Sequence, residues 1–393
     1  MAKLMFIHHS GLVGGAGVSL INTIKAVAEE NEIIVCVPSQ PEDMYYMLKK
    51  MEEQYNIRIE KYGRRIGAIT YYSGGDGSFS LRLWYRLWLI ICQWRYWNKI
   101  IGEYNPDKVI VNSKILCWMG YLRSVKSRKS ICFVRETMKG KKRNLINQVI
   151  SNSLDRFSSV IFLSAYDEKK EQLKKAFTNV IHNYVEESQF STSITREEAS
   201  KQLQLDENKF HVLYVGGVSH MKGFDLCIQA VLNLDAQIEL VVAGSTFEDA
   251  RLSKNKKVLQ YIDTWQTFIQ KNDLHHQIHL VGKQRDMSMC YSACDVLVFP
   301  MRAPHQSRPA FEAGFFKKPI IISRFENIDE FIKDGENGFR ISPDNTKELA
   351  EKIQILSKNH ELCEKMGLSN WRNTQTLHNQ AVNCGKIKEI LEK

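Results

Sequence analysis

Short apolar runs recur along the chain, and the segments between them are long enough to hold helices. In the first half these runs lie at 3–8, 33–37, 108–111, 130–134 and 160–163. A second series lies at 210–215, 238–243, 277–281, 296–299, 319–322 and 338–341, and it alternates with helical patterns such as 224–234 and 347–356. Buried strands of parallel sheets form such continuous apolar runs. Because strands and helices alternate in each of the two series, the sequence predicts two α/β domains with doubly wound parallel sheets.

A polar stretch separates the two series. Residues 186–206 contain no apolar run and are rich in Ser, Thr, Glu and Gln, which is typical of a hinge connection. We therefore expect one domain at 1–185 and another at 186–377. The segment 378–393 is amphipathic, and we expect it to pack back on the first domain. A chain of 393 residues suits two domains of ordinary size.

The charge is concentrated in one half of the chain. Hydrophobic residues make up 44% and charged residues 25%, which indicates a globular protein with a net charge of +10. Residues 1–190 hold 28 Lys and Arg against 18 Asp and Glu, whereas residues 191–393 hold 26 of each. The range 82–143 alone contains 15 basic and three acidic residues. An anionic partner is expected at this part of the surface.

Four of the seven tryptophans lie within residues 81–99, interleaved with Arg82, Arg86, Arg95 and Lys99. Trp favours the headgroup region of a bilayer, and Arg and Lys favour anionic lipid. The segment is apolar on nearly all sides, so a helix packed into the core of the first domain is the alternative. The basic runs at 123–129 and 139–143 favour a membrane surface. No apolar stretch is long enough to span a bilayer.

The cysteines and the N-terminus bear on the compartment. Nine cysteines, odd in number and scattered, lie mostly within apolar runs, which is typical of reduced, intracellular packing residues. The apolar stretch at 1–7 is too short for the core of an export signal. We therefore expect a cytoplasmic protein held peripherally at the inner face of the cell membrane.

The first candidate motif is the glycine-rich turn at 11–19, directly after the first strand. Gly15 and its neighbours allow a close approach of the backbone to a ligand, and the following helix offers unpaired N–H groups to an anion. The spacing is neither that of a P-loop nor that of the dinucleotide fingerprint. A plain strand-to-helix turn is the alternative.

The second motif, at 214–225, is again a strand, a glycine turn and a helix. Gly216 and Gly217 form the turn, and Lys222 falls where its ammonium group can meet phosphate oxygens beside a helix N-terminus. A solvated lysine at a helix start is the alternative.

The third motif, at 299–314, joins a strand end to a short helix through a polar loop. The loop carries Ser307 and Arg308, and the helix presents Glu312. A carboxylate at this place can accept hydrogen bonds from the paired hydroxyls of a ribose. A capping or surface acid is the alternative.

In this order the motifs resemble the retaining glycosyltransferases of the GT-B fold, in particular glycosyltransferase family 4. The resemblance is strongest in the second half, at 215–223, 242–244, 280–282, 291–300, 311–319 and 330–338. It implies two Rossmann-like domains facing each other across a cleft, the first for the acceptor and the second for a nucleotide sugar. It also implies a UDP-sugar as the favoured donor, retention of configuration, and no cofactor or metal ion.

Two positions depart from the family pattern. Gly217 stands where the family commonly has an arginine for the donor diphosphate, and Pro304 stands where it has the first of two glutamates. Either Arg308 and the backbone amides around Gln306 and Ser307 replace these contacts, or donor binding has been altered or lost.

The resemblance also assigns residues to the site. It implies catalytic roles for Arg135 and Glu136, which follow a strand in the first domain and would contact the sugar, the phosphate or acceptor hydroxyls; a salt-bridged pair without a ligand role is the alternative. Lys222 and Arg308 complete this catalytic set. The residues implied to bind the donor are Gly15, Gly216, Gly217, Lys222, Gly244, Gly282, Ser307, Arg308 and Glu312.

The expected function is transfer of a sugar to a lipid-linked glycan in surface polysaccharide or lipopolysaccharide biosynthesis. A non-catalytic GT-B protein that binds glycan or a partner, and a GT-B sugar-nucleotide epimerase, are the alternatives. A nucleic-acid partner is not expected, because the basic residues interleave with tryptophans and no nucleic-acid module is visible. A metal site is not expected at the histidine cluster of residues 274–279 either.

Overall fold

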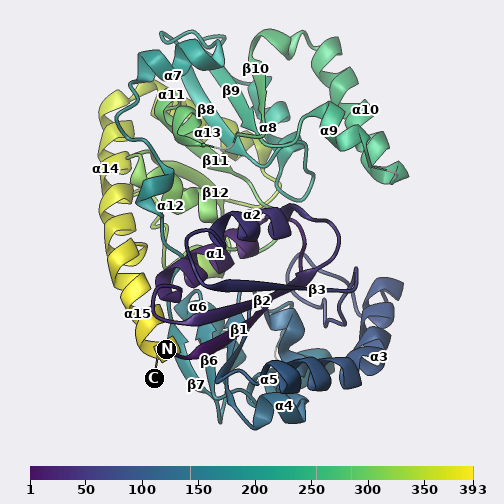
Figure 1. Ribbon diagram of the computed structural model, residues 1–393. Helices are drawn as coiled ribbons and strands as arrows, with labels where there is room; N and C mark the ends of the chain where they lie inside the picture. The colour runs from purple at the N-terminus through teal and green to yellow at the C-terminus, as the bar shows by residue number, and fades with distance from the viewer. Residues whose placement is uncertain (142, 254, 285, 393) are drawn as a thin grey trace. The chain divides into compact units, whose positions relative to one another are not determined.

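The computed structural model describes residues 1–141, 143–253, 255–284 and 286–392, which form two compact α/β units (Figure 1). The first unit comprises residues 1–183 and the C-terminal segment from Ala381, and the second comprises Tyr184–Gln380. Each unit is built around one parallel sheet with helices on its faces. The predicted fold class of two doubly wound parallel sheets is confirmed.

The first sheet has seven parallel strands in the order β3-β2-β1-β4-β5-β6-β7. These are β1 (Lys3–Ile7), β2 (Glu32–Pro38), β3 (Ile57–Tyr62), β4 (Lys108–Val111), β5 (Lys129–Val134), β6 (Ser159–Phe162) and β7 (Phe177–Val180). The strand order reverses between β1 and β4. In doubly wound sheets, ligands bind outside the carboxyl ends of the strands at such a reversal.

The helices of the first unit cover both faces of this sheet. They are α1 (Gly15–Val27), α2 (Asp43–Met51), α3 (Leu81–Tyr104), the 3-10 helix η1 (Lys114–Tyr121), α4 (Arg123–Lys126), α5 (Leu145–Leu154), α6 (Ala165–Glu171) and α15 (Gln380–Glu392). Met5 and Ile7 of β1 belong to a core that includes Trp97 and Ile101 of α3, while Leu4 and Phe6 are buried as well. Burial of alternate residues on both faces explains why the strand is continuously apolar.

The C-terminal helix α15 packs within the first unit. The Lys108 ammonium group donates a hydrogen bond of 2.6 Å to the Leu391 carbonyl, and Lys388 lies 3.5 Å from Glu30.

The second sheet has six parallel strands in the order β10-β9-β8-β11-β12-β13. These are β8 (Phe210–Val215), β9 (Ile238–Ala243), β10 (Ile278–Gly282), β11 (Val296–Phe299), β12 (Ile320–Ser323) and β13 (Gly338–Ile341). Val212 and Tyr214 face one core and Leu213 faces another. Here too the order reverses, between β8 and β11.

The helices of the second unit follow the same alternation. They are α7 (Arg196–Leu203), α8 (Phe224–Val231), α9 (Phe247–Arg251), α10 (Lys256–Lys271), α11 (Ser288–Ala293), α12 (Arg308–Phe315), α13 (Thr346–Lys358) and α14 (His360–Leu377), with 3-10 turns η2 (Glu187–Gln189), η3 (Leu274–His276) and η4 (Glu326–Ile328).

All eleven predicted apolar runs are strands, within one residue at each end, but two further strands were not predicted. β3 is buried only at its ends, Ile57 and Tyr62, and carries the exposed Arg58 and Lys61 between them. β7 is an edge strand without a fully buried residue. Neither strand therefore shows the continuous apolar run of a central strand.

Residues 186–206, predicted as a hinge connection, contain η2 and α7, and α7 packs against α11 inside the second unit. The division of the chain into two units falls between Asn183 and Tyr184, just before this stretch. Thr195 and Glu198 form a capping box at the start of α7, and Arg196 pairs with Asp295. The polar composition therefore reflects helix capping and ion pairing.

The helix α3 is only partly packed into the first unit. Leu83, Trp97 and Ile101 are buried, whereas Trp84 and Trp88 are 59% and 57% exposed. The alternative of a helix packed into the core of the first domain therefore holds for one side of α3, while another side is exposed. No helix within the described ranges is long and apolar enough to cross a bilayer.

Candidate functional site

The turn after β8 requires glycine. The N–H groups of Gly216 and Gly217 both donate to the Ala243 carbonyl, at 2.9 and 3.0 Å. Gly217 has φ of +61°, and a Cβ atom there would overlap the backbone of Ser245. A residue with a side chain would therefore meet both backbone strain and a steric clash.

The neighbouring strands end in glycine turns that touch this one. The Gly244 N–H donates to the Gly282 carbonyl at 2.9 Å, and a Cβ atom on Gly244 would lie 2.5 Å from the Gly217 nitrogen. Gly244 and Gly282 have φ of +129° and +72°. The turns at the carboxyl ends of β8 and β9 thus pack closely against each other, and that close packing requires glycine.

The close contact with Ser245 explains the departure at Gly217. An arginine at this position would overlap Ser245, so the turn as folded cannot hold the side chain that the family commonly has there. Any compensating cation must come from another element.

Lys222 lies beside this turn. A Cβ atom on Gly216 would come within 2.8 Å of the Lys222 Cδ atom, so the alkyl chain of the lysine lies over the glycine. Desolvation lowers the pKa of Lys222. Among the described residues, the structure gives its ammonium group no hydrogen-bond acceptor and no acidic partner. A half-buried cation without a partner is suited to an anionic ligand.

Arg302 joins the second and third motifs. Its N–H donates to the Met221 carbonyl at 3.1 Å, and its guanidinium group binds the Asp225 carboxylate at two points, 2.8 and 2.6 Å long. Its Nε also donates to Asp344 at 2.6 Å. This clamp fixes the loop that carries Lys222 against the loop that follows β11. Sequence reasoning missed Arg302 and Asp225, although both lie inside the motifs and their opposite charges were the available signal.

His305 lies in the electrostatic reach of Lys222. Desolvation and the positive charge of Lys222 lower the pKa of His305, which favours a neutral imidazole beside the lysine. The Ser307 hydroxyl donates to the His305 carbonyl at 3.3 Å, at the start of α12.

Arg308 and Glu312 bind each other one turn apart on α12. The Arg308 Nε donates to one Glu312 oxygen at 2.6 Å, and the buried Tyr291 hydroxyl donates to the other at 2.9 Å. The Arg308 Nη1 atom is buried without a hydrogen-bond partner. The sequence predicted that Arg308 and Glu312 each contact the donor separately, whereas in the structure they form one ion pair. The contact of Tyr291 with Glu312 was not predicted from the sequence.

In the first unit, Arg135 belongs to a polar cluster at the strand reversal. Its Nε and Nη2 atoms donate to the Asn112 side-chain oxygen at 2.8 and 2.7 Å. The Asn112 nitrogen donates to the Ala16 carbonyl and lies 3.0 Å from the His8 Nδ1 atom. Burial lowers the pKa of His8, so this imidazole is neutral. Gly15 starts α1 with open space where its Cβ atom would be.

Glu136 supports a neighbouring turn. One carboxylate oxygen accepts a hydrogen bond from the Ser113 hydroxyl, and the other accepts from the Lys114 N–H at 3.0 Å. Desolvation raises the pKa of Glu136. Both oxygens are thus engaged at the start of η1.

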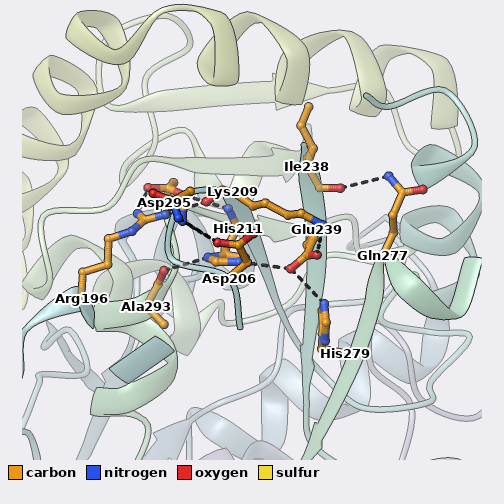
Figure 2. A network of polar contacts seen from close by, with 11 residues as sticks. Arg196, Asp206, Lys209, His211, Ile238, Glu239, Gln277, His279, Ala293 and Asp295 are labelled. Atoms are coloured by element: carbon orange, nitrogen blue, oxygen red, sulfur yellow. Dashed lines mark hydrogen bonds and ion pairs between the residues drawn. The ribbon is translucent and has the colours of Figure 1, made fainter. Parts of the chain in front are cut away.

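The opposite edge of the second sheet holds a charged network (Figure 2). At the amino ends of the strands, Glu239 lies between Lys209, His211 and His279, at 2.7, 3.3 and 3.0 Å. Asp295 accepts from the His211 N–H at 2.8 Å and pairs with Arg196. These charges are paired within the unit.

The histidine cluster at 274–279 is divided between two places. His279 faces Glu239, whereas His275 and His276 are exposed beside Asp273, with ligand atoms within 4.8 Å of one another. Such exposed groups commonly occur without a bound ion.

Known proteins share both sequence and fold with this chain. Residues 195–370 match the family described as Glycosyl transferases group 1. An uncharacterized glycosyltransferase of Methanocaldococcus jannaschii is 29% identical over 171 residues, 43% of this chain and 44% of that protein. CapM, a capsular polysaccharide biosynthesis glycosyltransferase of Staphylococcus aureus, is 25% identical over 182 residues, 42% of this chain and 45% of that protein. The aligned part is thus less than half of each relative.

The fold likeness extends over the whole chain. The crystal structure of HepE from Anabaena, in complex with UDP and glucose, has a TM-score of 0.76 at 19% identity and covers 100% of both chains. At this identity the likeness shows the fold.

Proposed function

We propose that this protein transfers a sugar from a nucleotide diphosphate sugar to a glycan acceptor, and the match of residues 195–370 to the family described as Glycosyl transferases group 1 supports this proposal. The observation that carries the proposal is Lys222, a half-buried cation without an anionic partner among the described residues, beside three glycine turns. These groups lie at the carboxyl edge of a doubly wound sheet, where such sheets bind nucleotides. A UDP-sugar is the favoured donor, since HepE, which shares the fold, was crystallised with UDP.

Within the donor site, Lys222 binds the diphosphate beside the glycine turns. Glu312 binds the ribose hydroxyls, and its geometry is set by Arg308 and Tyr291. The free Nη1 atom of Arg308 supplies the additional donor that Gly217 cannot. Ser307 adds its hydroxyl at the start of α12.

The chemistry proposed is retaining and independent of metal ions. A sugar leaves its nucleotide diphosphate when the negative charge that develops on the diphosphate is stabilised, and Lys222 and Arg308 supply that stabilisation. Arg135 and Gly15 of the first unit serve the acceptor and the transferred sugar. Glu136 contributes indirectly, since its oxygens hold the turn at Ser113 and Lys114.

The acceptor proposed is a lipid-linked glycan, and α3 supports this choice. The most exposed large apolar residues along it are Leu81, Trp84, Trp88 and Ile91, at 87%, 59%, 57% and 76%. Trp97, by contrast, is part of the core. Basic residues follow at 123–129 and 139–143, of which Lys142 lies outside the described residues. An aromatic face near basic residues favours an anionic bilayer at the cytoplasmic surface. CapM, which acts in capsular polysaccharide biosynthesis, supports a polysaccharide product.

The test is nucleotide binding followed by turnover. Binding to the native state raises the melting temperature by mass action, so a panel of nucleoside diphosphates and their sugars should give the largest shift with UDP. The nucleotide sugar that binds is then offered with membrane extract, and glycolipid product is measured. Absence of a shift with every nucleotide would overturn the proposal.

A non-catalytic binding protein is the second candidate, and the departures at Gly217 and Pro304 favour it. Such a protein would bind glycan or a partner without turnover, whereas an enzyme would hydrolyse or transfer the bound sugar.

Flotation with anionic and neutral vesicles tests the proposed membrane binding separately. Trp84→Ser with Trp88→Ser should reduce binding to anionic vesicles. Trp265→Ser in the second unit is unsuitable as a control, because Trp265 is buried and its loss would destabilise the fold. The exposed Tyr46→Ser is the matched control.

A further inference from the structure

The first unit contains a basic pocket that the donor chemistry does not use. Its volume is about 370 Å³, and it lies outside the carboxyl ends of β1, β2 and β3. Four arginines line it: Arg64 and Arg65 from the loop after β3, and Arg82 and Arg86 from α3. Volumes of roughly 300–1,000 Å³ are usual for sites that bind small molecules.

The arginines are not neutralised by the pocket wall. No Asp or Glu is among the described residues that line it, and the nearby Asp76 reaches only Arg82, at 3.8 Å. Desolvation and the charges of Arg82 and Arg65 lower the pKa of Arg86. Like charges held this close repel one another, and an anion in the pocket would relieve that repulsion.

Several contacts hold the pocket ready for a ligand. The Arg86 Nη1 atom donates to the Ile66 carbonyl at 2.7 Å, and the Arg65 guanidinium lies 5.7 Å from the centre of the Tyr85 ring. His9 also lines the pocket, and its Nδ1 atom is buried without a hydrogen-bond partner. Desolvation, with Arg86 and Arg135, lowers the pKa of His9 to about 4, so its imidazole is neutral.

The position of the pocket in the sheet also indicates a binding site. His9 follows β1, and Ile115, which lines the opposite side, lies in η1 after β4. The strand order reverses between β1 and β4, so the pocket lies at the place where doubly wound sheets bind ligands.

We propose that this pocket binds a phosphate or diphosphate group of the acceptor, an inference that rests on the proposed glycosyltransferase function. Guanidinium groups bind phosphate oxygens through paired hydrogen bonds. The helix α3 presents Arg82 and Arg86 to the pocket and, within two turns, exposes Trp84 and Trp88. A lipid phosphate would place its anionic group on the arginines and its chain beside the tryptophans.

The experiment is calorimetric titration of the full chain, already saturated with UDP, with two probes: inorganic pyrophosphate and farnesyl diphosphate. Saturation with UDP keeps the probes from the donor site. The variant R64Q/R65Q/R82Q removes three pocket charges and leaves Arg86, which supports Ile66. The control R95Q/K99Q/R123Q removes three exposed charges outside the pocket.

We expect both probes to bind the parent and the control, and farnesyl diphosphate to bind more tightly than pyrophosphate. The pocket variant should bind both probes about 100-fold more weakly, since several charge-assisted hydrogen bonds are lost. Unchanged affinity in the pocket variant, or an equal loss in the control, would overturn the proposal. Equal affinity of the two probes would contradict the proposal that the phosphate group belongs to a lipid, and would indicate a free phosphate compound as the ligand.

UDP binding, measured on the same samples, separates this proposal from the proposed function. UDP binding with no probe binding would overturn the pocket assignment alone. If UDP does not bind the parent, the proposed function fails, and probe binding that still depends on the pocket arginines would keep the phosphate site.

Discussion

The two edges of the second sheet use the same strands in opposite ways. At the amino edge, Glu239 contacts Lys209, His211 and His279, so the charges are paired inside the protein (Figure 2). At the carboxyl edge, β8, β9 and β10 end in glycine turns, and the structure gives the nearby Lys222 no acidic partner among the described residues.

The amino edge of the sheet thus contributes to the stability of the fold, whereas the carboxyl edge is suited to binding an anionic ligand. A buried charge is tolerated when it is paired and hydrogen-bonded, and the amino edge meets that condition. An unpaired, half-buried cation lowers stability and raises affinity for an anion. The comparison therefore predicts that substitutions at the amino edge change folding, whereas substitutions at the carboxyl edge change ligand binding.

The largest effect is expected from Glu239→Ala at the amino edge. Loss of this buried carboxylate leaves the Lys209 ammonium group without its anion and the imidazoles of His211 and His279 without their contact with Glu239, and we expect a decrease of about 3–5 kcal/mol in the free energy of unfolding. Urea unfolding measures this decrease. The fraction that remains folded should bind UDP with unchanged affinity; a loss of affinity in the folded fraction would break the separation between the edges.

Gly217→Arg tests the carboxyl edge by restoring the residue that the family commonly has. The arginine would require φ of +61° and would overlap Ser245, so we expect a loss of about 2–4 kcal/mol in stability and weaker UDP binding. Gly14→Ala, at an open site in the first unit, is the control. Tighter UDP binding by Gly217→Arg would contradict this prediction, because it would show that the turn can change its conformation to hold an arginine.

Much of the fold could be predicted from the sequence because central parallel strands are buried on both faces. The run at 238–243 is apolar apart from Glu239, and it matches β9 at both ends. The edge strand β7 could not be found in this way, since half-exposed strands lack a continuous apolar run. The helix α7 within the polar stretch at 186–206 was not predicted, because Thr195 and Glu198 cap it with the same residue types that occur in linkers.

The candidate site was predictable only in part. Glycine turns and Lys222 follow strands directly, so sequence position brings them to one edge of the sheet. The contact of Tyr291 with Glu312 depends on how α11 and α12 pack, and the clamp of Arg302 on Asp225 joins residues 77 positions apart. Such contacts leave no local pattern in the sequence. Arg308 and Glu312, by contrast, stand four residues apart on one helix, a spacing at which opposite charges can pair.

Lys222→Met should have the reverse effect to Glu239→Ala. Loss of the charge-assisted contact with a diphosphate is expected to weaken UDP binding by about 1.5–3 kcal/mol, measured by calorimetry. Stability should be unchanged or higher, because desolvation already disfavours the charged lysine. Lys209→Met is the matched control at the amino edge: it should lower stability and leave UDP affinity unchanged. Equal effects of the two lysine variants on UDP affinity would contradict the comparison.

The smallest effect expected is a pH dependence that belongs to the amino edge. Desolvation, together with Arg196, lowers the pKa of His211, so the unfolded chain binds its proton more readily than the folded protein does. His211 therefore stabilises the fold above its unfolded pKa of about 6.5, and this contribution is lost as the pH falls below it. We expect His211→Gln to reduce the decrease in unfolding free energy between about pH 7.5 and about pH 5.5. His8 and His9 act in the same direction in both proteins, so the difference between parent and variant isolates His211. Parallel stability profiles would show that protonation of His211 is not coupled to folding at this edge.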